Sequence, residues 1–200
     1  MAMTRAQLRA QIQRNRRDPA ALLHSITDYD DAINEAIRQI PEPLWRLSVD
    51  SSLTTVAETR RYSLASLTDI TQPWQVRRVW VEGDDGHYYQ IGRWEIEDDL
   101  GTLYLVLDED PPAADRTIKL EYYAAHAALS SDATAHTFDD DWLVYKATAI
   151  MLMEADRDAE DAKAVQADLA LFDGMRAQRE RILLARRNRT ATKTRTQVWS

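Results

Sequence analysis

Residues 139–155, with the sequence DDDWLVYKATAIMLMEA, decide the fold class of the C-terminal half of the chain. Three aspartates open the stretch, and the helix dipole favours anionic side chains at a helix N-terminus. From Trp142 onward the stretch is apolar almost all round, which is typical of a helix covered on every side. We therefore predict a buried helix whose neighbours include other subunits. The predicted subunit-interface residues are Trp142, Tyr145, Ile150 and Met153.

A second helix is expected after the polar residues 156–161. Apolar side chains then recur every three or four positions, at Ala162, Val165, Leu169, Phe172 and Met175. The pattern predicts a helix that runs to about Asn188, with arginines in its last turns, where the helix dipole favours cations. Residues 131–188 are thus expected to form a helical hairpin.

The last twelve residues, 189–200, are polar, basic and rich in threonine. They offer no core residues, and we predict an extended basic tail that is disordered in the free protein. Bases alternate with threonines and a tryptophan lies near the end, so an extended tail would suit addition to the sheet edge of a partner. The candidate partner-binding residues are Arg186, Arg187, Arg189, Thr190, Lys193, Arg195, Val198 and Trp199.

The middle of the chain, residues 46–130, has the period-two pattern of β-strands. Strands are expected within 52–56, 61–64, 75–81, 87–91, 93–97, 102–107 and 116–123, and residues 84–86 are expected to form a turn between two of them. They predict a small antiparallel β-sandwich or barrel inserted between helices. Its loops carry an acidic surface that would meet a partner. The residues of this predicted surface are Asp84, Asp85, Asp98, Asp99, Asp108, Glu109 and Asp110.

Residues 1–45 are expected to supply the first helices of the bundle. Thr4 is a candidate N-cap, and Thr27 with Asp30 forms a second capping pattern. Ile33, Ala36 and Ile37 then lie on one apolar face. The predicted fold is α+β: a bundle of N-terminal helices and a long C-terminal helical hairpin, with an inserted β domain and an extended tail.

Composition excludes several functional classes. The chain has 200 residues, no cysteine and five glycines, whose positions allow no dinucleotide, P-loop or nucleophile-elbow motif. Neither disulfides nor thiol catalysis is possible, and no two of the four histidines have the spacing of a helical zinc pair. We expect no catalytic residue, metal or cofactor. No stretch of about 18 apolar residues occurs, so no membrane span is expected.

Charge is distributed unevenly along the chain. Residues 1–17 contain five arginines and no acid, residues 82–115 contain eleven acids and one base, and residues 176–200 contain eight bases and one acid. Two basic ends and an acidic middle are typical of a protein that meets different partners at different surfaces.

The order of these segments resembles the head-to-tail connector, or adaptor, proteins of tailed bacteriophages. A capped helix (TDYDDAINEA, 27–36) leads to Trp45, then to LTTV (53–56) and RYSL (61–64). A β block ends in IKLEYYA (118–124), and an apolar helix, a second helix and a basic tail follow. The arrangement is similar to adaptors with a β domain inserted in a helical bundle, such as the tail-tube gatekeepers of short-tailed phages.

The resemblance implies a non-enzymatic virion protein of the neck, between the capsid portal and the tail, assembled in the host cytoplasm. Such proteins form rings, usually twelve-fold, that retain packaged DNA until ejection. Their C-terminal segment reaches into the portal protein, which here maps onto Arg186, Arg187 and residues 189–200. The β domain would face the downstream tail or neck protein, and its acidic surface would face that protein or the channel.

A ring of twelve copies at −8 each would carry a charge of −96. Double-stranded DNA would therefore pass through the channel without specific binding, because like charges repel.

Two alternatives stay open on the sequence. One is a small intracellular module that uses its Arg-rich ends to bind nucleic acid or act as a regulatory adaptor. The other is a metal-assisted hydrolase that uses Asp98, Asp99, Asp108 and Asp110.

Overall fold

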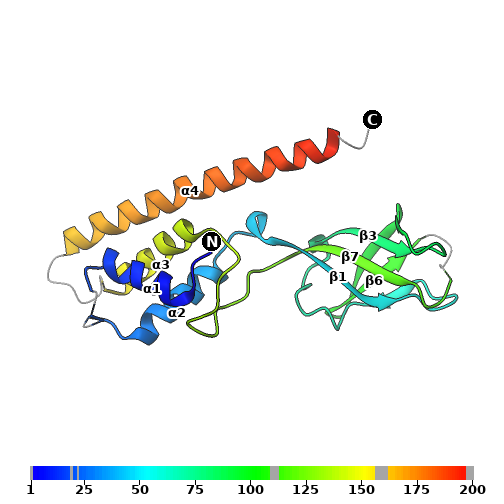
Figure 1. Ribbon diagram of the computed structural model, residues 1–200, viewed down its shortest axis with the longest axis horizontal. Helices are drawn as coiled ribbons and strands as arrows, with labels where there is room; N and C mark the ends of the chain where they lie inside the picture. Colours follow the sequence, from blue (N-terminus) through cyan, green and yellow to red (C-terminus); the bar gives the residue numbers. More distant parts are fainter. Residues whose placement is uncertain (1, 19, 22, 109–112, 156–161, 197–200) are drawn as a thin grey trace. The chain divides into compact units, whose positions relative to one another are not determined.

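The computed structural model describes residues 2–18, 20–21, 23–108, 113–155 and 162–196 (Figure 1). The chain forms two compact units. The helical unit consists of Met1–Leu44 together with His126–Ser200, and the β unit is Trp45–Ala125. The β unit is therefore inserted into the helical unit, and the fold class is α+β.

The described residues of the helical unit form four α-helices and a short 3₁₀ helix. Their bounds are α1 Arg5–Asn15, α2 Ile26–Arg38, η1 Glu42–Leu44, α3 Asp140–Ala155 and α4 Ala162–Thr196. Helix α3 contacts each of α1, α2 and α4. Three helices of the same chain therefore cover the apolar sides of α3.

Buried side chains of α1, α2 and α3 form the core of the helical unit. The largest that are fully buried in these helices are Trp142, Tyr29, Leu8, Ile12, Ile33, Leu143 and Met151. In α2, Ala32, Ile33, Ala36 and Ile37 lie on one buried stripe, as helical periodicity predicts.

Both N-terminal helices begin with a capping box, but only one at the predicted residue. The prediction for Thr4 is confirmed, since its hydroxyl accepts from the Gln7 backbone N–H. For α2 the prediction of Thr27 was wrong: the N-cap is Ser25, paired reciprocally with Asp28. Ser25 and Thr27 are each followed three residues later by an aspartate, so both fit the capping pattern. Asp30, the partner expected for Thr27, instead forms an ion pair with Arg9.

The predicted extended tail was wrong over residues 189–196. Helix α4 does not end near Asn188 but continues to Thr196. Once a helix is nucleated, each further residue adds a hydrogen bond at little cost, so a stable upstream helix propagates through moderate helix formers. Residues 197–200, with Val198 and Trp199, lie outside the described part of the chain.

In the part of the β unit that the structure describes, the strands form two antiparallel sheets. Their strands are β1 Arg46–Thr54, β2 Arg61–Ser63, β3 Val76–Glu82, β4 Tyr88–Gln90, β5 Trp94–Asp99, β6 Thr102–Leu107 and β7 Thr117–Ala124. One sheet has the order β1-β7-β3-β4 and the other β2-β6-β5. Both sheets are open, so the barrel that was one of the predicted alternatives is wrong. A closed barrel requires that the edge strands pair with each other. Here β1 and β4 are the edges of one sheet, β2 and β5 are the edges of the other, and none of these four strands pairs with another edge strand.

One hydrophobic core joins the two sheets. Strand β7 alternates strictly, with Ile118, Leu120 and Tyr122 buried, and it lies between β1 and β3. Leu105 and Leu107 of β6 belong to the same cluster of buried residues. The predicted turn at residues 84–86 is confirmed, and Gly86 there has a φ of 74°, a value that favours glycine.

Gly174 lies in the interior of α4 without an evident packing reason. A Cβ placed there meets no atom within 4 Å. We expect Gly174→Ala to raise the free energy of unfolding by about 0.5–1 kcal/mol, because glycine is a poor helix former. Urea unfolding followed by circular dichroism measures this, with Gly86→Ala as a control that is expected to destabilise. A loss of stability for Gly174→Ala would contradict the expectation.

Candidate interaction surfaces

Helix α4 is held against the start of α3 by a set of specific contacts. The Arg179 guanidinium donates to both carboxylate oxygens of Asp139, at 2.8 and 2.7 Å. The Trp142 indole Nε1 donates to Glu180 at 3.4 Å, and the rings of Tyr145 and Phe172 lie 6.4 Å apart. These contacts fix α4 as far as residue 180, and a further contact with η1 supports it.

Asp139 has two roles in this anchor. One of its oxygens accepts from the Trp142 backbone N–H at 3.0 Å, which caps α3. Burial raises the pKa of Asp139, but the hydrogen bonds from Arg179 and from the Trp142 backbone outweigh burial and hold the pKa below its ordinary value. Asp139 is therefore a carboxylate at neutral pH, and it ties the two long helices together.

Beyond residue 180, α4 continues past the start of α3 as a basic helix (Figure 1). Residues 181–196 carry six cations and no acid, over about 24 Å of helix at 1.5 Å per residue. Six of the predicted partner-binding residues belong to this segment. Arg186 is exposed and Arg187 is half-buried, while Arg189, Thr190, Lys193 and Arg195 continue the helical backbone.

The predicted subunit-interface residues occupy different environments. Trp142 is buried inside the helical unit, where its ring meets the Phe138 ring edge-on at 5.3 Å. It therefore offers no surface to a partner in this conformation. Tyr145 and Ile150 are half-buried, and Met153 is 49% exposed.

Sequence reasoning did not foresee a groove between α2 and α3. Its volume is about 330 Å³. The groove is lined by Asp28, Asp31, Ala32, Glu35, Arg38, Ile150 and Glu154. The acids come from α2 and from the last turn of α3, so the sequence of either helix alone could not predict the groove. Helical spacing in α2, with Asp28, Asp31 and Glu35 at intervals of three and four, was the available signal.

The predicted acidic surface of the β unit is divided among local contacts. Asp84 pairs with Arg116, and Asp99 pairs with Arg61 at 2.9 Å. Asp98 accepts from the Gly101 backbone N–H in the turn between β5 and β6. Asp108 is exposed, whereas Glu109 and Asp110 lie outside the described residues.

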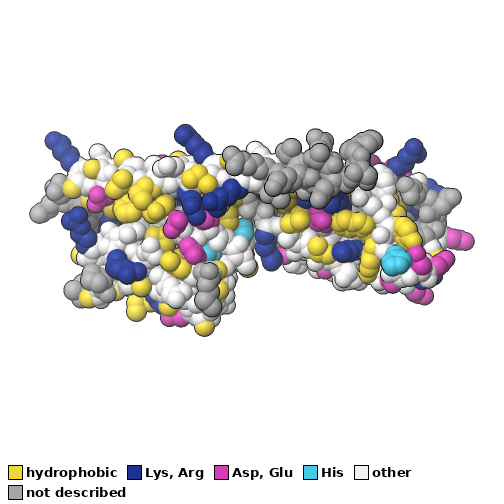
Figure 2. Space-filling view, turned by 45° about the horizontal axis from the view of Figure 1, so that its top comes forward, with side chains coloured by type: hydrophobic (Ala, Val, Ile, Leu, Met, Phe, Trp, Pro, Cys, Tyr) yellow, Lys and Arg dark blue, Asp and Glu magenta, His cyan; other side chains and the backbone are white. Residues whose placement is uncertain are grey.

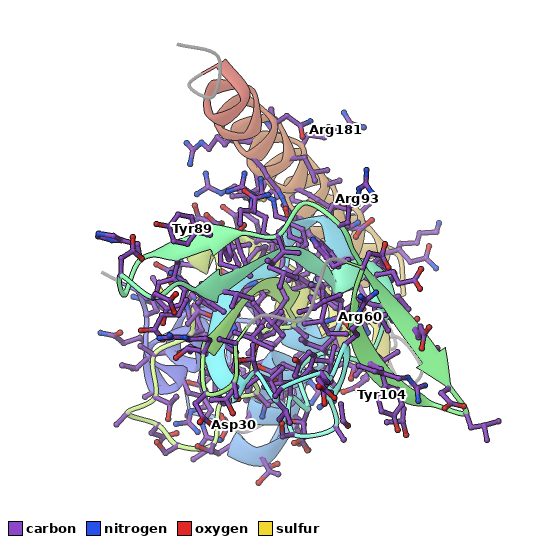
Figure 3. The ribbon with its side chains drawn as sticks, turned by 90° about the vertical axis from the view of Figure 1, so that its right-hand side faces the viewer. Asp30, Arg60, Tyr89, Arg93, Tyr104 and Arg181 are labelled. Carbon is purple, nitrogen blue, oxygen red and sulfur yellow. The ribbon has the colours of Figure 1, made fainter. Side chains whose placement is uncertain are left out.

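Asp85 holds the turn before β4. It accepts from the Tyr89 hydroxyl at 2.5 Å, and Tyr89 is exposed at the surface of the β unit (Figure 3). This hydrogen bond, together with one from the His87 backbone, lowers the pKa of Asp85. In the parts of the chain that the structure describes, no three His, Asp or Glu side chains are grouped to hold a metal ion.

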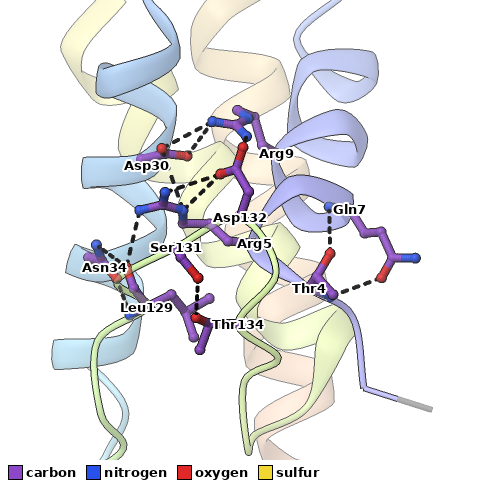
Figure 4. A network of polar contacts seen from close by, with 10 residues as sticks. All are labelled: Thr4, Arg5, Gln7, Arg9, Asp30, Asn34, Leu129, Ser131, Asp132 and Thr134. Atoms are coloured by element: carbon purple, nitrogen blue, oxygen red, sulfur yellow. Dashed lines mark hydrogen bonds and ion pairs between the residues drawn. The ribbon is translucent and has the colours of Figure 1, made fainter.

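A buried ionic network joins α1 to α2 and to the loop before α3 (Figure 4). Arg9 donates to both oxygens of Asp30 at 3.0 Å and pairs with Asp132 at 2.6 Å. Arg5 pairs with Asp132 at 3.1 Å and donates to the Leu129 carbonyl. The side chains of Arg9 and Asp30 are only 10% and 15% exposed. Sequence reasoning missed the network because its partners lie 21 and more than 100 residues apart.

None of the described helices is long and apolar enough to span a membrane. A helical unit with an inserted β unit and a projecting basic helix offers protein-binding surfaces, and the comparison with known families identifies the class: a structural adaptor of tailed phages. The chain belongs to the SU10 adaptor protein family, whose sequence model matches residues 3–197. No curated protein matches the chain.

Membership of this family makes the chain a phage head-to-tail adaptor and a virion component that interacts with other phage head or tail proteins. Families of this kind are in general structural rather than enzymatic. The predicted recognition of an adaptor from the order of elements is thereby confirmed.

Proposed function

We propose that the chain forms the adaptor ring of the virion neck and that it docks on the portal protein through the basic C-terminal part of α4. The observation that carries this proposal is the segment 181–196 at the C-terminal end of α4, which contains six cations and no acid. A projecting cationic helix suits an acidic groove on a partner, because complementary charge steers association and sets its orientation.

The helical state of residues 189–196 changes the proposed docking mechanism. An extended segment would add a strand to the sheet of a partner, whereas a helix has already satisfied its backbone hydrogen bonds within itself. We therefore propose helix-in-groove docking. Because this segment is already ordered before binding, docking costs less conformational entropy than the folding of a disordered tail.

The proposed ring has twelve copies, connects the portal to a downstream tail or neck protein through the β unit, and surrounds the channel for double-stranded DNA. The net charge of −8 per copy supports a channel wall that DNA does not bind, because phosphates are repelled by a surface of the same sign. The ring would thus retain the genome until ejection by closing the portal end rather than by gripping DNA. Assembly would take place in the host cytoplasm.

A truncation tests the portal contact. Removing residues 189–200 leaves the Asp139–Arg179 anchor in place, so the helical unit is expected to keep its fold while portal binding weakens at least tenfold. Size-exclusion chromatography with light scattering, on the chain alone and mixed with the portal protein of the same phage, measures the complex. Circular dichroism checks the fold.

A matched charge variant serves as the control. Lys193→Gln with Arg195→Gln removes two charges from α4, and Arg60→Gln with Arg93→Gln removes two exposed charges from the β unit. Only the first set is expected to weaken portal binding. Undiminished binding by the truncated chain would overturn the proposal, and salt-sensitive DNA binding by the free protein would favour the nucleic-acid-binding alternative.

A further inference from the structure

The side of α4 that faces away from α3 is apolar where a surface helix is ordinarily charged. Leu171 is 56% exposed and Ile182 is 38% exposed, and hydrophobic side chains are visible along the helical unit in the space-filling view (Figure 2). The exposed positions recur at intervals of three and four. They are Ala164, Ala167, Leu171, Gly174, Gln178, Ile182 and Ala185. We call this set the outer face of α4.

The spacing of the outer face is the spacing at which one helix packs against another. The opposite side of α4, with Val165, Leu169 and Phe172 half-buried, already packs toward α3. Gly174 lies at the centre of the outer face and has no neighbour within 4 Å of a placed Cβ. Contacts within the chain do not require a glycine at this position. Glycine, without a side chain, does allow the backbone of another subunit to approach closely.

The groove between α2 and α3 has complementary properties. Its lining contains four acids and one base, so the groove is negatively charged. The acids are Asp28, Asp31, Glu35 and Glu154, and the base is Arg38. Ile150 lies in the groove, and the exposed Met153 precedes Glu154. One edge of the outer face of α4 carries the exposed cations Lys163 and Arg181, and Figure 3 shows Arg181 on this helix. The other edge carries one exposed acid, Asp168.

We propose that the outer face of α4 in one copy docks into the α2–α3 groove of a second copy. Leu171 and Ile182 then cover Ile150 and Met153, and Arg181 meets the carboxylates of the groove. The two surfaces differ, so the contact is heterologous: each copy offers one surface of each kind, and successive contacts close into a ring. The inference rests on the proposed ring and assigns the surfaces that build it.

Cross-linking tests this contact directly, because the chain contains no cysteine. Met153→Cys places a thiol beside the groove and Gln178→Cys places one on the outer face of α4. In a chain that carries both, a short bismaleimide is expected to produce a ladder of dimers, trimers and larger species when the portal protein is present. Each single variant should stay monomeric, and a mixture of the two should stop at dimers.

Gln166→Cys is the matched control, since Gln166 is exposed on a different side of α4. Met153→Cys with Gln166→Cys should give at least tenfold less cross-linked product. Dimers from Gln178→Cys alone would overturn the proposal in favour of a symmetric contact between two α4 helices. A pair at 153 and 178 that cross-links no better than the control would overturn it as well.

A charge variant gives a second readout. Gly174→Glu puts a carboxylate on the face that meets the acidic groove, and ring formation on the portal is expected to fall at least tenfold. Gln166→Glu adds the same charge elsewhere on α4 and should leave assembly unchanged. If the unmodified chain forms a ring on the portal while both tests fail, only this interface is wrong. If the unmodified chain forms no ring, the proposed function fails with it.

Discussion

Replacing Asp30 by alanine is expected to lower the free energy of unfolding of the helical unit by about 3 kcal/mol, because removal of one member of a buried ion pair leaves the other charge uncompensated. Arg9 lies 3.0 Å from both oxygens of Asp30, and both side chains are largely buried. Asp132, which also pairs with Arg9, is 56% exposed and replaces Asp30 only in part. Urea unfolding followed by circular dichroism measures the loss.

A double variant distinguishes two contributions to this loss of stability: the lost attraction between Arg9 and Asp30, and the cost of leaving one buried charge without its partner. Burial raises the pKa of Asp30 even though Arg9 and Arg5 act to lower it, so desolvation outweighs the attraction. Arg9→Met combined with Asp30→Leu removes both charges and keeps apolar volume, and it is expected to lose less stability than Asp30→Ala alone. Losses that simply add in the double variant would contradict this account.

Asp139→Ala, made as a single variant, is also expected to lower the free energy of unfolding by about 3 kcal/mol. About 1 kcal/mol comes from the lost N-cap of α3 and about 2 kcal/mol from the hydrogen bonds to the Arg179 guanidinium. Asp139→Asn keeps a good capping residue but removes the charge, so about 2 kcal/mol should be lost. Equal stability of the alanine and asparagine variants would show that the cap contributes nothing.

The same carboxylate predicts a dependence on pH. The pKa of Asp139 is lowered in the folded chain, so its contribution is fully present above the ordinary aspartate pKa of about 4. It is lost as the pH falls through the lower folded value, where the carboxylate takes up a proton. The difference in stability between the wild-type chain and Asp139→Asn should therefore be constant from pH 5 to 7 and shrink below about pH 4. A difference that grows in acid would refute the role of the anion.

Local signals in the sequence predicted the elements well where neighbouring residues determine them. The Thr4 cap, the buried stripe from Ile33 to Ile37 and the turn before Gly86 were foreseen, since each depends on residues close together in the chain. Thr27 was predicted as the cap because Asp30 completes a capping pattern with it, whereas the structure has Ser25 there. The pattern could not show that Asp30 faces Arg9 of another helix.

Longer-range features escaped prediction. Strand β1 begins at Arg46, earlier than the strand predicted within 52–56, and the alternating residues Leu47 and Val49 of its first half are exposed rather than in the core. The sheets were foreseen as a set of strands, whereas their order depends on β7 lying between β1 and β3. The extension of α4 to Thr196 was missed because threonine-rich sequence is a weak helix former and only the upstream anchor explains it.

The candidate interaction residues illustrate the same division. The cations of α4 were found from charge alone, because no fold is needed to count them. Trp142 was chosen because its helix is apolar almost all round, yet its burial against Phe138 and Glu180 depends on the packing of α3. The acidic residues of the β unit were seen as one surface, but Asp84, Asp85 and Asp99 each have a local partner.

The pairing of β1 with β7 has an evolutionary consequence. Arg46 is the register partner of Ala124, so the β unit begins and ends on adjacent positions of one antiparallel ladder. Paired residues of this kind lie about 5 Å apart, a gap that a tight turn bridges. The helical unit can therefore gain, lose or exchange the inserted unit as a cassette without moving its own chain ends. Recombination between phages can in this way replace the β unit while the helical unit remains unchanged.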